Sequence, residues 1–158
     1  MAGIFDRLIE DHNRHREFFA KIAETSGDSE ERRTLFEQLR IDVTAHASAE
    51  EQSLYAEMMS RPELSDDARH SVAEHKELDD LIGELVEMDM SSPAWLTKFK
   101  TLRHDYEHHI DEEEDEMFPT ADEELSKAVE TKLGKIFADR KPAEMEKAAE
   151  GHMGDERE

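Results

Sequence analysis

The sequence HASAE at residues 46–50 has a counterpart, HIDEE, at residues 109–113. Each stretch places a glutamate four residues after a histidine, which is about one turn of an α-helix, so the two side chains project from one face. The flanks also match, because LY at residues 54–55 follows the first stretch and MF at residues 117–118 follows the second. Imidazole nitrogens and carboxylate oxygens are donors that divalent transition metals accept. The pattern predicts a helical protein with a His/Glu metal site.

The composition limits the classes of fold and function. The 158 residues suit one domain with a hydrophobic core, while 39% charged residues and a mean hydropathy of -0.88 indicate long helices with solvated outer faces. A formal net charge of -22 repels nucleic-acid phosphates and anionic lipid. We therefore expect small molecules, cations or basic proteins as partners, with no nucleic acid and no membrane among them.

The chain contains no cysteine, and this restricts any metal site. Without thiolates, histidines and carboxylates must hold the metal. The N-terminus lacks the pattern of a signal peptide, and the apolar runs are too short to span a bilayer. We therefore expect a cytoplasmic protein.

Runs rich in glycine, proline and serine divide the chain into four long helices and a shorter fifth. The connections are short, so successive long helices should run antiparallel in an all-α, up-down-up-down four-helix bundle. Asp28, Ser65 and Ser92 are expected to cap the second, third and fourth helices, and Thr120 the fifth. The predicted helices cover residues 3–25, 29–60, 65–89, 93–118 and 120–140.

The predicted domain covers residues 1–140, with the four-helix bundle at residues 3–118. The fifth helix, at residues 120–140, has an apolar face that can pack across the bundle or against another subunit, so the chain is expected to be a monomer or a homodimer. Residues 141–158 are charged and contain few large apolar groups, which predicts a polar, flexible tail.

The apolar stripe of each helix indicates which polar residues face the interior. In the fourth helix, large apolar residues recur at alternating spacings of four and three up to Tyr106, and the same rhythm continues to His109 and Glu113. His46 and Glu50 continue the stripe of the second helix in the same way. The polar residues on the four stripes are His12 and His15, His46 and Glu50, His75 and Asp79, and His109 and Glu113.

These eight polar side chains need a partner inside the bundle. Each buried group left unpaired costs several kcal/mol, against a total stability of roughly 5–15 kcal/mol. A bound cation removes this conflict, because the carboxylates offset part of its charge and the imidazoles supply neutral nitrogens. We predict a site for two metal ions, which suits iron and also accommodates manganese or zinc.

Four motifs in order resemble the hemerythrin family, specifically the bacterial hemerythrin-like proteins with an HHE cation-binding domain. They are DH at residues 11–12, HxxxEExxLY at residues 46–55, EH at residues 74–75 and HxxxEExxMFP at residues 109–119. The resemblance covers about the first three quarters of the chain and implies a di-iron centre. The metal ligands that it implies are His12, His46, Glu50, His75, His109 and Glu113.

Three residues depart from the family pattern or extend it. Asp79 stands where the oxygen-carrying hemerythrins have a second histidine, and it is either a metal ligand or a neighbour of the ligands. This difference places oxygen carriage of the invertebrate kind in doubt. His15 is a candidate fifth nitrogen ligand, or a hydrogen-bonding neighbour of a ligand carboxylate. Tyr106 is either an ordinary core aromatic or a phenol that contacts a small molecule at the metal or donates an electron to it.

Another di-iron architecture and another pair of ligands compete with this assignment. A ferritin-like bundle expects Glu-x-x-His on two helices, and this tetrapeptide does not occur in the chain. His108 and Glu112 repeat the spacing of His109 and Glu113 one residue earlier, but only the later pair continues the stripe through Tyr106. We therefore assign the interior pair to His109 and Glu113.

The resemblance implies oxygen binding, redox or oxygen sensing, nitric oxide handling, iron homeostasis or peroxide decomposition in different members. We expect a non-haem di-iron protein that binds dioxygen, peroxide or nitric oxide in redox and stress response or in iron homeostasis. One alternative is a di-iron enzyme that decomposes hydrogen peroxide. Another is a metal store or a structural metal site.

Substitution of the two adjacent histidines tests the register of the fourth helix. His109→Ala should abolish the oxygen-sensitive absorption of the iron-loaded protein, whereas His108→Ala should leave metal content and spectrum nearly unchanged, since a solvated side chain contributes little. Metal analysis and absorption spectra measure both effects. The reverse result would assign the site to His108 and Glu112.

Overall fold

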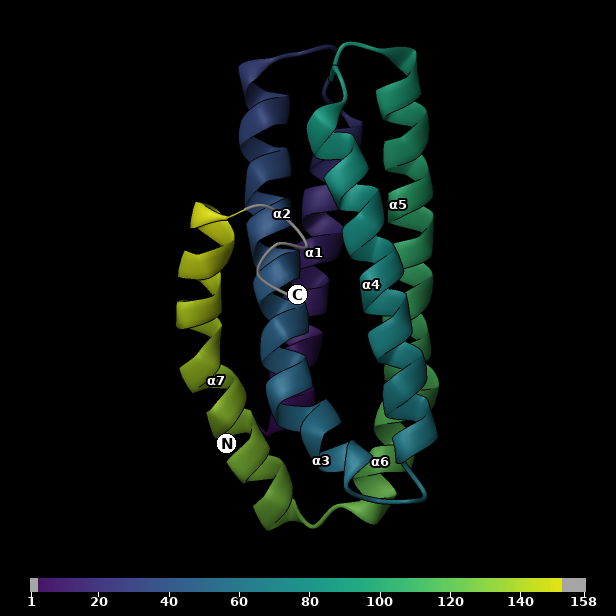
Figure 1. Ribbon diagram of the computed structural model, residues 1–158, viewed down its shortest axis with the longest axis vertical. Helices are drawn as coiled ribbons and strands as arrows, with labels where there is room; N and C mark the ends of the chain where they lie inside the picture. The colour runs from purple at the N-terminus through teal and green to yellow at the C-terminus, as the bar shows by residue number, and fades with distance from the viewer. Residues whose placement is uncertain (1–2, 152–158) are drawn as a thin grey trace.

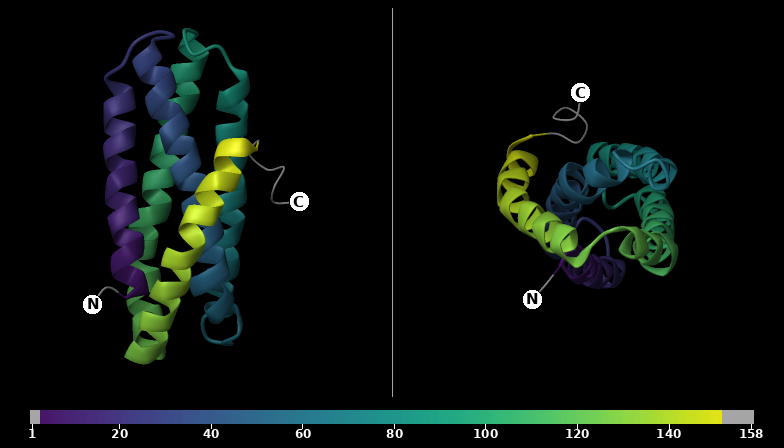
Figure 2. Two further views of the ribbon diagram at one scale, coloured as in Figure 1. Left: turned by 90° about the vertical axis from the view of Figure 1, so that its left-hand side faces the viewer. Right: turned by 90° about the horizontal axis from the view of Figure 1, so that it is seen from below.

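The computed structural model describes residues 3–151, which contain helices and no strand. Four long helices, α1, α2, α4 and α5, run up, down, up and down, and α7 lies against the outside of this bundle (Figures 1 and 2). The predicted four-helix bundle with an additional C-terminal helix is therefore confirmed. The helices are α1 (Ile4–Ala23), α2 (Glu30–Glu50), α3 (Ala56–Met59), α4 (Ser65–Glu87), α5 (Pro93–Glu112), α6 (Phe118–Glu124) and α7 (Lys127–Glu150).

Two of the long helices continue through π-helical turns. The turn Glu51–Tyr55 joins α2 to α3, and the turn Glu113–Met117 joins α5 to α6. The prediction that the fourth helix ends near Pro119 and that Thr120 caps a new helix is wrong, because helical structure continues to Glu124. Proline has no N–H to donate to the preceding turn, but a π turn directly before it already departs from the α-helical hydrogen-bond pattern.

The starts of the other helices agree in part with the predicted caps. Ser92 caps α5 as predicted, and its side chain accepts a hydrogen bond from a backbone N–H in the first turn. Ser29, rather than the predicted Asp28, caps α2 in the same way. Ser65 is the first residue of α4 and makes no capping bond. A cap prediction based on residue type therefore locates a helix start to within a residue.

The C-terminal helix differs from the prediction at both ends. It begins after Ser126, which caps it, and continues to Glu150 with Pro142 inside the helix. The part of the predicted flexible tail at residues 141–150 is therefore helical, and residues 152–158 of that tail lie outside the described residues.

Polar contacts explain why this charged segment packs on the bundle. Glu144 of α7 is buried and accepts hydrogen bonds from Ser48 of α2 and from Gln52 of the following π turn. Ala148, one turn later, is also buried. These hydrogen bonds compensate for the desolvation of the buried carboxylate. A count of large apolar groups does not detect such polar contacts.

The hydrophobic core consists of two clusters separated by a polar layer. In α1, His12 and His15 lie between Leu8 of the lower cluster and Phe19 of the upper cluster. The same order holds along the other three bundle helices. The predicted interior histidines and glutamates therefore occupy one level of the bundle, with apolar packing above and below them.

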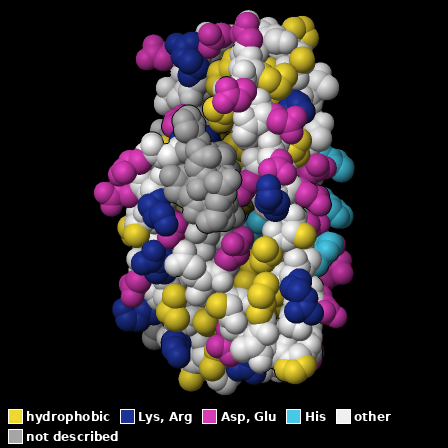
Figure 3. All heavy atoms as spheres, in the orientation of Figure 1, with side chains coloured by type: hydrophobic (Ala, Val, Ile, Leu, Met, Phe, Trp, Pro, Cys, Tyr) yellow, Lys and Arg dark blue, Asp and Glu magenta, His cyan; other side chains and the backbone are white. Residues whose placement is uncertain are grey.

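The outer surface carries the charge that the composition predicts. Figure 3 shows acidic and basic side chains spread over the face of the molecule, with apolar side chains scattered among them. None of the helices within residues 3–151 combines the length and apolar content needed to cross a membrane.

Two neighbouring residues near the end of α4 provide a test of core packing. The periodicity of this helix places Val86 on the apolar stripe with Leu85 beside it, but Leu85 is fully buried and Val86 is 42% exposed. We expect Leu85→Ala to lower the free energy of unfolding by about 2–5 kcal/mol, since it leaves a cavity. Val86→Ala should change it by less than about 1 kcal/mol. Chemical denaturation of both variants measures the difference, and equal losses would contradict the packing described.

Candidate metal centre

The six residues that the family resemblance implies as ligands lie together in the polar layer. They come from α1, α2 and its end, α4, and α5 with the π turn that follows it. None of the six is more than 4% exposed. The six are His12, His46, Glu50, His75, His109 and Glu113.

Glu50 lies between two of the histidines. Its Oε1 is 3.6 Å from Nε2 of His46 on the same helix and 3.4 Å from Nε2 of His75 on α4. Ligand atoms of Glu50, His75 and His109 all lie within 4.8 Å of one another. These atoms are close enough to bind one cation with modest adjustment.

Glu113 lies between the other two histidines. Its Oε1 is 3.3 Å from Nε2 of His12 and 3.4 Å from Nε2 of His109, which is one turn earlier on the same helical rod. The hydroxyl of Tyr55 donates a hydrogen bond to the second carboxylate oxygen of Glu113. Each glutamate therefore faces one histidine of its own helix and one histidine of another helix.

The inward-facing atoms of this cluster are buried without hydrogen bonds. Buried polar atoms are normally paired, since an unpaired one costs free energy of desolvation. A group of such atoms that converge on one another is the arrangement expected of metal ligands, so the residues fit a bound cation. The unpaired atoms are Nε2 of His12, His46 and His109, both carboxylate oxygens of Glu50, and Oε1 of Glu113.

The opposite nitrogen, Nδ1, of each of the four histidines contacts a carboxylate. A carboxylate accepts, so Nδ1 carries the hydrogen and the lone pair of Nε2 points inward. Each acidic partner lies beside an implied ligand in the sequence, yet bonds a histidine of the next helix, and the four bonds close a ring around the bundle. The pairs are His46 with Asp11 at 2.8 Å, His75 with Glu51 at 2.7 Å, His109 with Glu74 at 2.7 Å and His12 with Glu114 at 2.7 Å.

The sequence contained a signal for this ring. In the motifs DH and EH and in the two EE pairs, an acidic residue adjoins an implied metal ligand in the sequence. The histidine that each acid bonds lies on another helix. Only the packing of the helices shows which histidine donates its hydrogen bond to each acid. The four acids are therefore functional residues that sequence reasoning noted without assigning a role.

His15, the candidate fifth nitrogen ligand, has hydrogen-bond partners at both ring nitrogens. Its Nδ1 lies 2.6 Å from the hydroxyl of Tyr106, and its Nε2 lies 2.7 Å from Oδ1 of Asp42. Both ring nitrogens are used, and neither is left for a metal. The alternative interpretation, a hydrogen-bonding neighbour of the centre, fits these contacts.

Helix α7 contributes to the surroundings of the centre, and the sequence analysis missed this contribution. Nζ of Lys141 lies 2.8 Å from Oδ2 of Asp11 and 3.1 Å from Oδ1 of Asp42. Arg14 of α1 also bonds both carboxylates. The ring of Phe137 packs edge-on against His46 at 5.6 Å between centroids. No local pattern marks Lys141, because it lies in a charged segment whose packing depends on the whole fold.

The remaining predicted residues separate into interior and surface groups. Tyr106 is buried one turn from His109, and Asp79 is buried one turn from His75 on α4. His109 is buried, whereas the side chain of His108 is 67% exposed. The register of α5 therefore places His109 inside the bundle.

Burial and neighbouring charges shift the protonation of the centre when no metal is present. Burial and the adjacent Glu113 raise the pKa of Glu50 well above its ordinary value. Burial also acts to raise the pKa of Glu113, but His109 and His12 outweigh it and lower this pKa. Burial lowers the pKa of His46 to about 3. Burial also acts to lower the pKa of His12, but the nearby carboxylates of Glu113 and Glu114 outweigh it and raise this pKa to about 9. Protons therefore compensate part of the buried charge of the metal-free site.

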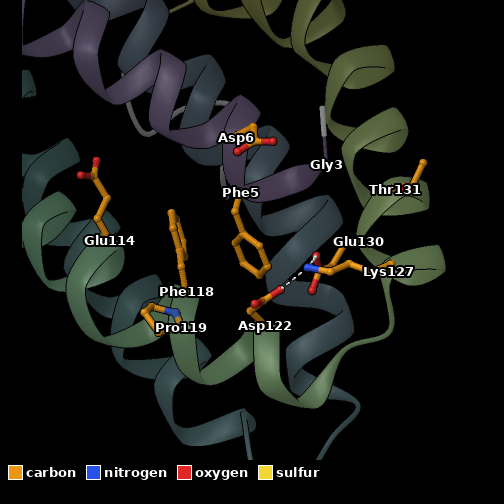
Figure 4. Close-up of a pocket in the computed structure, with 10 residues that line it drawn as sticks. All are labelled: Gly3, Phe5, Asp6, Glu114, Phe118, Pro119, Asp122, Lys127, Glu130 and Thr131. Carbon is orange, nitrogen blue, oxygen red and sulfur yellow. Dashed lines mark hydrogen bonds and ion pairs between the residues drawn. The ribbon is translucent and has the colours of Figure 1, made fainter. Parts of the chain in front are cut away.

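Figure 4 shows the residues that line a surface pocket of about 460 Å³. Phe118 and Phe5 line it, and their rings are 5.1 Å apart. The ring of Phe118 also stacks on His12 at 6.0 Å, and Glu114, the hydrogen-bond partner of His12, lines the pocket as well. Phe118 and Glu114 therefore connect the lining of the pocket to His12 in the polar layer.

Comparisons with known proteins identify the family of the chain. The family described as Hemerythrin HHE cation binding domain matches residues 3–121. The chain is 28% identical over 115 residues to uncharacterized proteins of Mycobacterium tuberculosis (Rv2633c) and Mycobacterium bovis (Mb2666c), covering 73% of this chain and 70% of each relative. It also resembles the crystal structure of a Hemerythrin HHE cation binding domain-containing protein from Mycobacterium kansasii, a homolog of Rv2633c. That similarity has a TM-score of 0.82 at 27% identity and covers 93% of this chain and 90% of the other.

The fold and the convergent His/Glu cluster define a helical, cation-binding protein. The chain belongs to the Hemerythrin HHE cation binding domain family.

The hydrogen bonds to Asp42 predict how the stability of the metal-free protein depends on pH. Burial acts to raise the pKa of Asp42, but hydrogen bonds to His15 and Arg14 lower it well below the ordinary value of 3.8. A lowered pKa in the folded state stabilises the protein above pH 3.8, and this contribution is lost as pH falls toward the folded-state pKa. The difference in unfolding free energy between wild type and Asp42→Asn should therefore shrink as pH falls from about 4 to about 2.

Chemical denaturation across this pH range measures the difference. Asp105→Asn, which changes a carboxylate at the surface beside His104, serves as the control and should give a small difference at every pH. A difference for Asp42→Asn that stays constant as pH falls would contradict the described ion pairs.

Proposed function

We propose that this protein is a non-haem di-iron protein that binds dioxygen, peroxide or nitric oxide in redox and stress response or in iron homeostasis. One observation carries the proposal. Buried nitrogens of His12, His46 and His109 converge with the carboxylates of Glu50 and Glu113, and these inward atoms have no hydrogen bonds. Neutral nitrogens with two carboxylates suit divalent iron, and they also suit manganese or zinc.

The division of the cluster supports a site for two ions. Glu50 faces His46 and His75, while Glu113 faces His12 and His109, so there are two groups of donors side by side. Six protein ligands are too few to fill the coordination of two iron ions, and open positions remain. Iron bound there would supply redox chemistry and open positions for a small oxygen- or nitrogen-containing ligand.

The residues around the cluster orient it and exclude water. The ring of carboxylates fixes each imidazole so that Nε2 faces inward, which preorganises the donors. Burial raises the pKa of Tyr106 well above its ordinary value, so its hydroxyl keeps its proton at neutral pH. His15 holds this hydroxyl in place at 2.6 Å. The apolar clusters above and below leave a small ligand few routes of access, and the pocket beside Phe118 is the candidate route.

We further propose that the protein acts in the cytoplasm as a monomer or homodimer, with a small molecule rather than nucleic acid or a membrane as its partner. The net charge of -22 supports this part of the proposal, because it disfavours contact with anionic polymers and lipid surfaces.

Metal analysis combined with absorption spectroscopy tests the proposal. We expect purified protein loaded with ferrous iron under anaerobic conditions to hold two iron ions and to change its spectrum reversibly on exposure to air and reduction. An iron-loaded protein whose spectrum does not respond to oxygen, peroxide or nitric oxide would overturn the small-molecule function. Equal stabilisation by zinc in that case would support a metal store or a structural site instead.

A second candidate function is decomposition of hydrogen peroxide. The hydrogen-bonded series of Tyr106, His15 and Asp42 favours it, because it links a buried phenol near the centre to the surface groups around Asp42. Such a series can supply protons or an electron during turnover. Oxygen evolution from peroxide by the iron-loaded protein, lost in His109→Ala and reduced in Tyr106→Phe, would support this function.

Removal of either glutamate should release the metal. We expect Glu50→Ala and Glu113→Ala each to lose most of the bound metal and to lower the melting temperature of the metal-loaded protein, since metal binding to the folded state stabilises it. Glu116→Ala, which changes an exposed residue of the same π turn as Glu113, is the matched control and should keep its metal. Full metal occupancy in both glutamate variants would contradict the assignment.

A further inference from the structure

The bundle carries a second pair of His-x-x-x-Glu sequences outside its buried centre. His70 and Glu74 lie on α4, and His108 and Glu112 lie on the neighbouring α5. The spacing repeats that of His46 with Glu50, yet these pairs face solvent instead of the interior. Figure 3 shows histidine side chains gathered on the side of the molecule formed by α4 and α5.

The two surface pairs converge on each other. Nε2 of His70 lies 3.2 Å from Oε2 of Glu74 and 3.2 Å from Oε1 of Glu112. One ligand atom from each of His70, Glu74 and Glu112 lies within 4.8 Å of the other two. A metal ion bound about 2.1 Å from each nitrogen and oxygen ligand holds neighbouring ligand atoms roughly 3.0–3.4 Å apart. The two nitrogen–oxygen distances of 3.2 Å at His70 fall within this range.

A hydrogen bond alone does not account for this convergence. Nε2 of His70 carries at most one hydrogen, and it makes a hydrogen bond with Glu112 only. Glu74 lies equally close to the same nitrogen without sharing that bond. Two carboxylates that approach one imidazole nitrogen from two helices repel each other, and a divalent cation among them would turn this repulsion into attraction.

Further groups extend this cluster. Nε2 of His108 is 4.0 Å from Oε2 of Glu112, so a second imidazole adjoins the three converging atoms. The side chain of His70 is 58% exposed, while those of Glu74 and Glu112 are 21% and 33% exposed. A cation from solvent can therefore reach the cluster directly, and the carboxylates are already partly ordered by packing.

We propose that His70, Glu74 and Glu112 form a second, surface site for a divalent transition metal ion, with His108 in position to complete it. The site is distinct from the buried centre but shares one residue with its surroundings. Oε1 of Glu74 accepts the hydrogen bond of Nδ1 of His109, while Oε2 of the same carboxylate faces His70. An ion at the surface site would therefore sit one carboxylate away from an implied ligand of the buried centre.

Zinc titration of the iron-loaded protein tests this site. We expect wild type to bind one Zn²⁺ per chain in isothermal titration calorimetry while its iron content stays unchanged. His70→Ala and Glu112→Gln should each weaken this zinc binding roughly tenfold or more, as expected on loss of a ligand. His104→Ala is the matched control, because His104 is an exposed histidine one turn before His108 on the same helix, and it should bind zinc like wild type.

The choice of variants keeps the result interpretable. His70 and Glu112 are outside the buried centre, so the iron content and melting temperature of both variants should equal those of wild type. Zinc binding that is the same in wild type, His70→Ala and Glu112→Gln would overturn the proposal. Absence of zinc binding to iron-loaded wild type, or zinc uptake accompanied by equal loss of iron, would overturn it as well.

Discussion

The need to pair buried imidazole and carboxylate atoms governs this structure. Four histidines and two glutamates lie at one level of a bundle whose apolar clusters exclude water, and an unpaired polar atom there is costly. The outer nitrogens are paired by a ring of carboxylates that passes through all four bundle helices. The inward imidazole nitrogens and carboxylate oxygens have no such partner, and a bound cation would pair them. Since each bond of the ring joins two helices, sliding one helix along its neighbours by one turn would break the bonds on both of its sides, so the ring also fixes the axial register of the bundle.

The sequence revealed those parts of the fold and site that depend on local periodicity. His109 was placed inside because it continues an apolar stripe, and the structure buries it while leaving His108 exposed. Features that depend on contacts between distant segments were not predictable. His15 lies on the stripe of α1 like a ligand, but two partners on other helices, Tyr106 and Asp42, occupy both of its ring nitrogens. Pro119 resembles a helix end, and only the π turn before it lets the helix continue.

Helix α7 shows how a fifth element can contribute to a centre without providing any of its ligands. Lys141 bonds the carboxylates of Asp11 and Asp42, which in turn bond His46 and His15. Burial acts to raise the pKa values of Asp11 and Asp42, but the hydrogen bonds to His46 and His15, with a smaller contribution from Lys141, lower them below the ordinary range. Both carboxylates therefore stay charged close to the centre. Phe137 covers the edge of His46. The charged character of this segment, which predicted flexibility, is what allows Lys141 to pair with Asp11 of α1 and Asp42 of α2.

The ring of hydrogen bonds has a further property, which is twofold symmetry. The hairpins α1–α2 and α4–α5 each carry an acidic residue followed by histidine on the first helix and HxxxEE on the second. Asp11 bonds His46 as Glu74 bonds His109, and Glu51 bonds His75 as Glu114 bonds His12. Each glutamate of the centre also faces one histidine from each hairpin. Neither hairpin can therefore assemble half of the centre alone, because each glutamate needs a histidine from the other hairpin as well as one from its own.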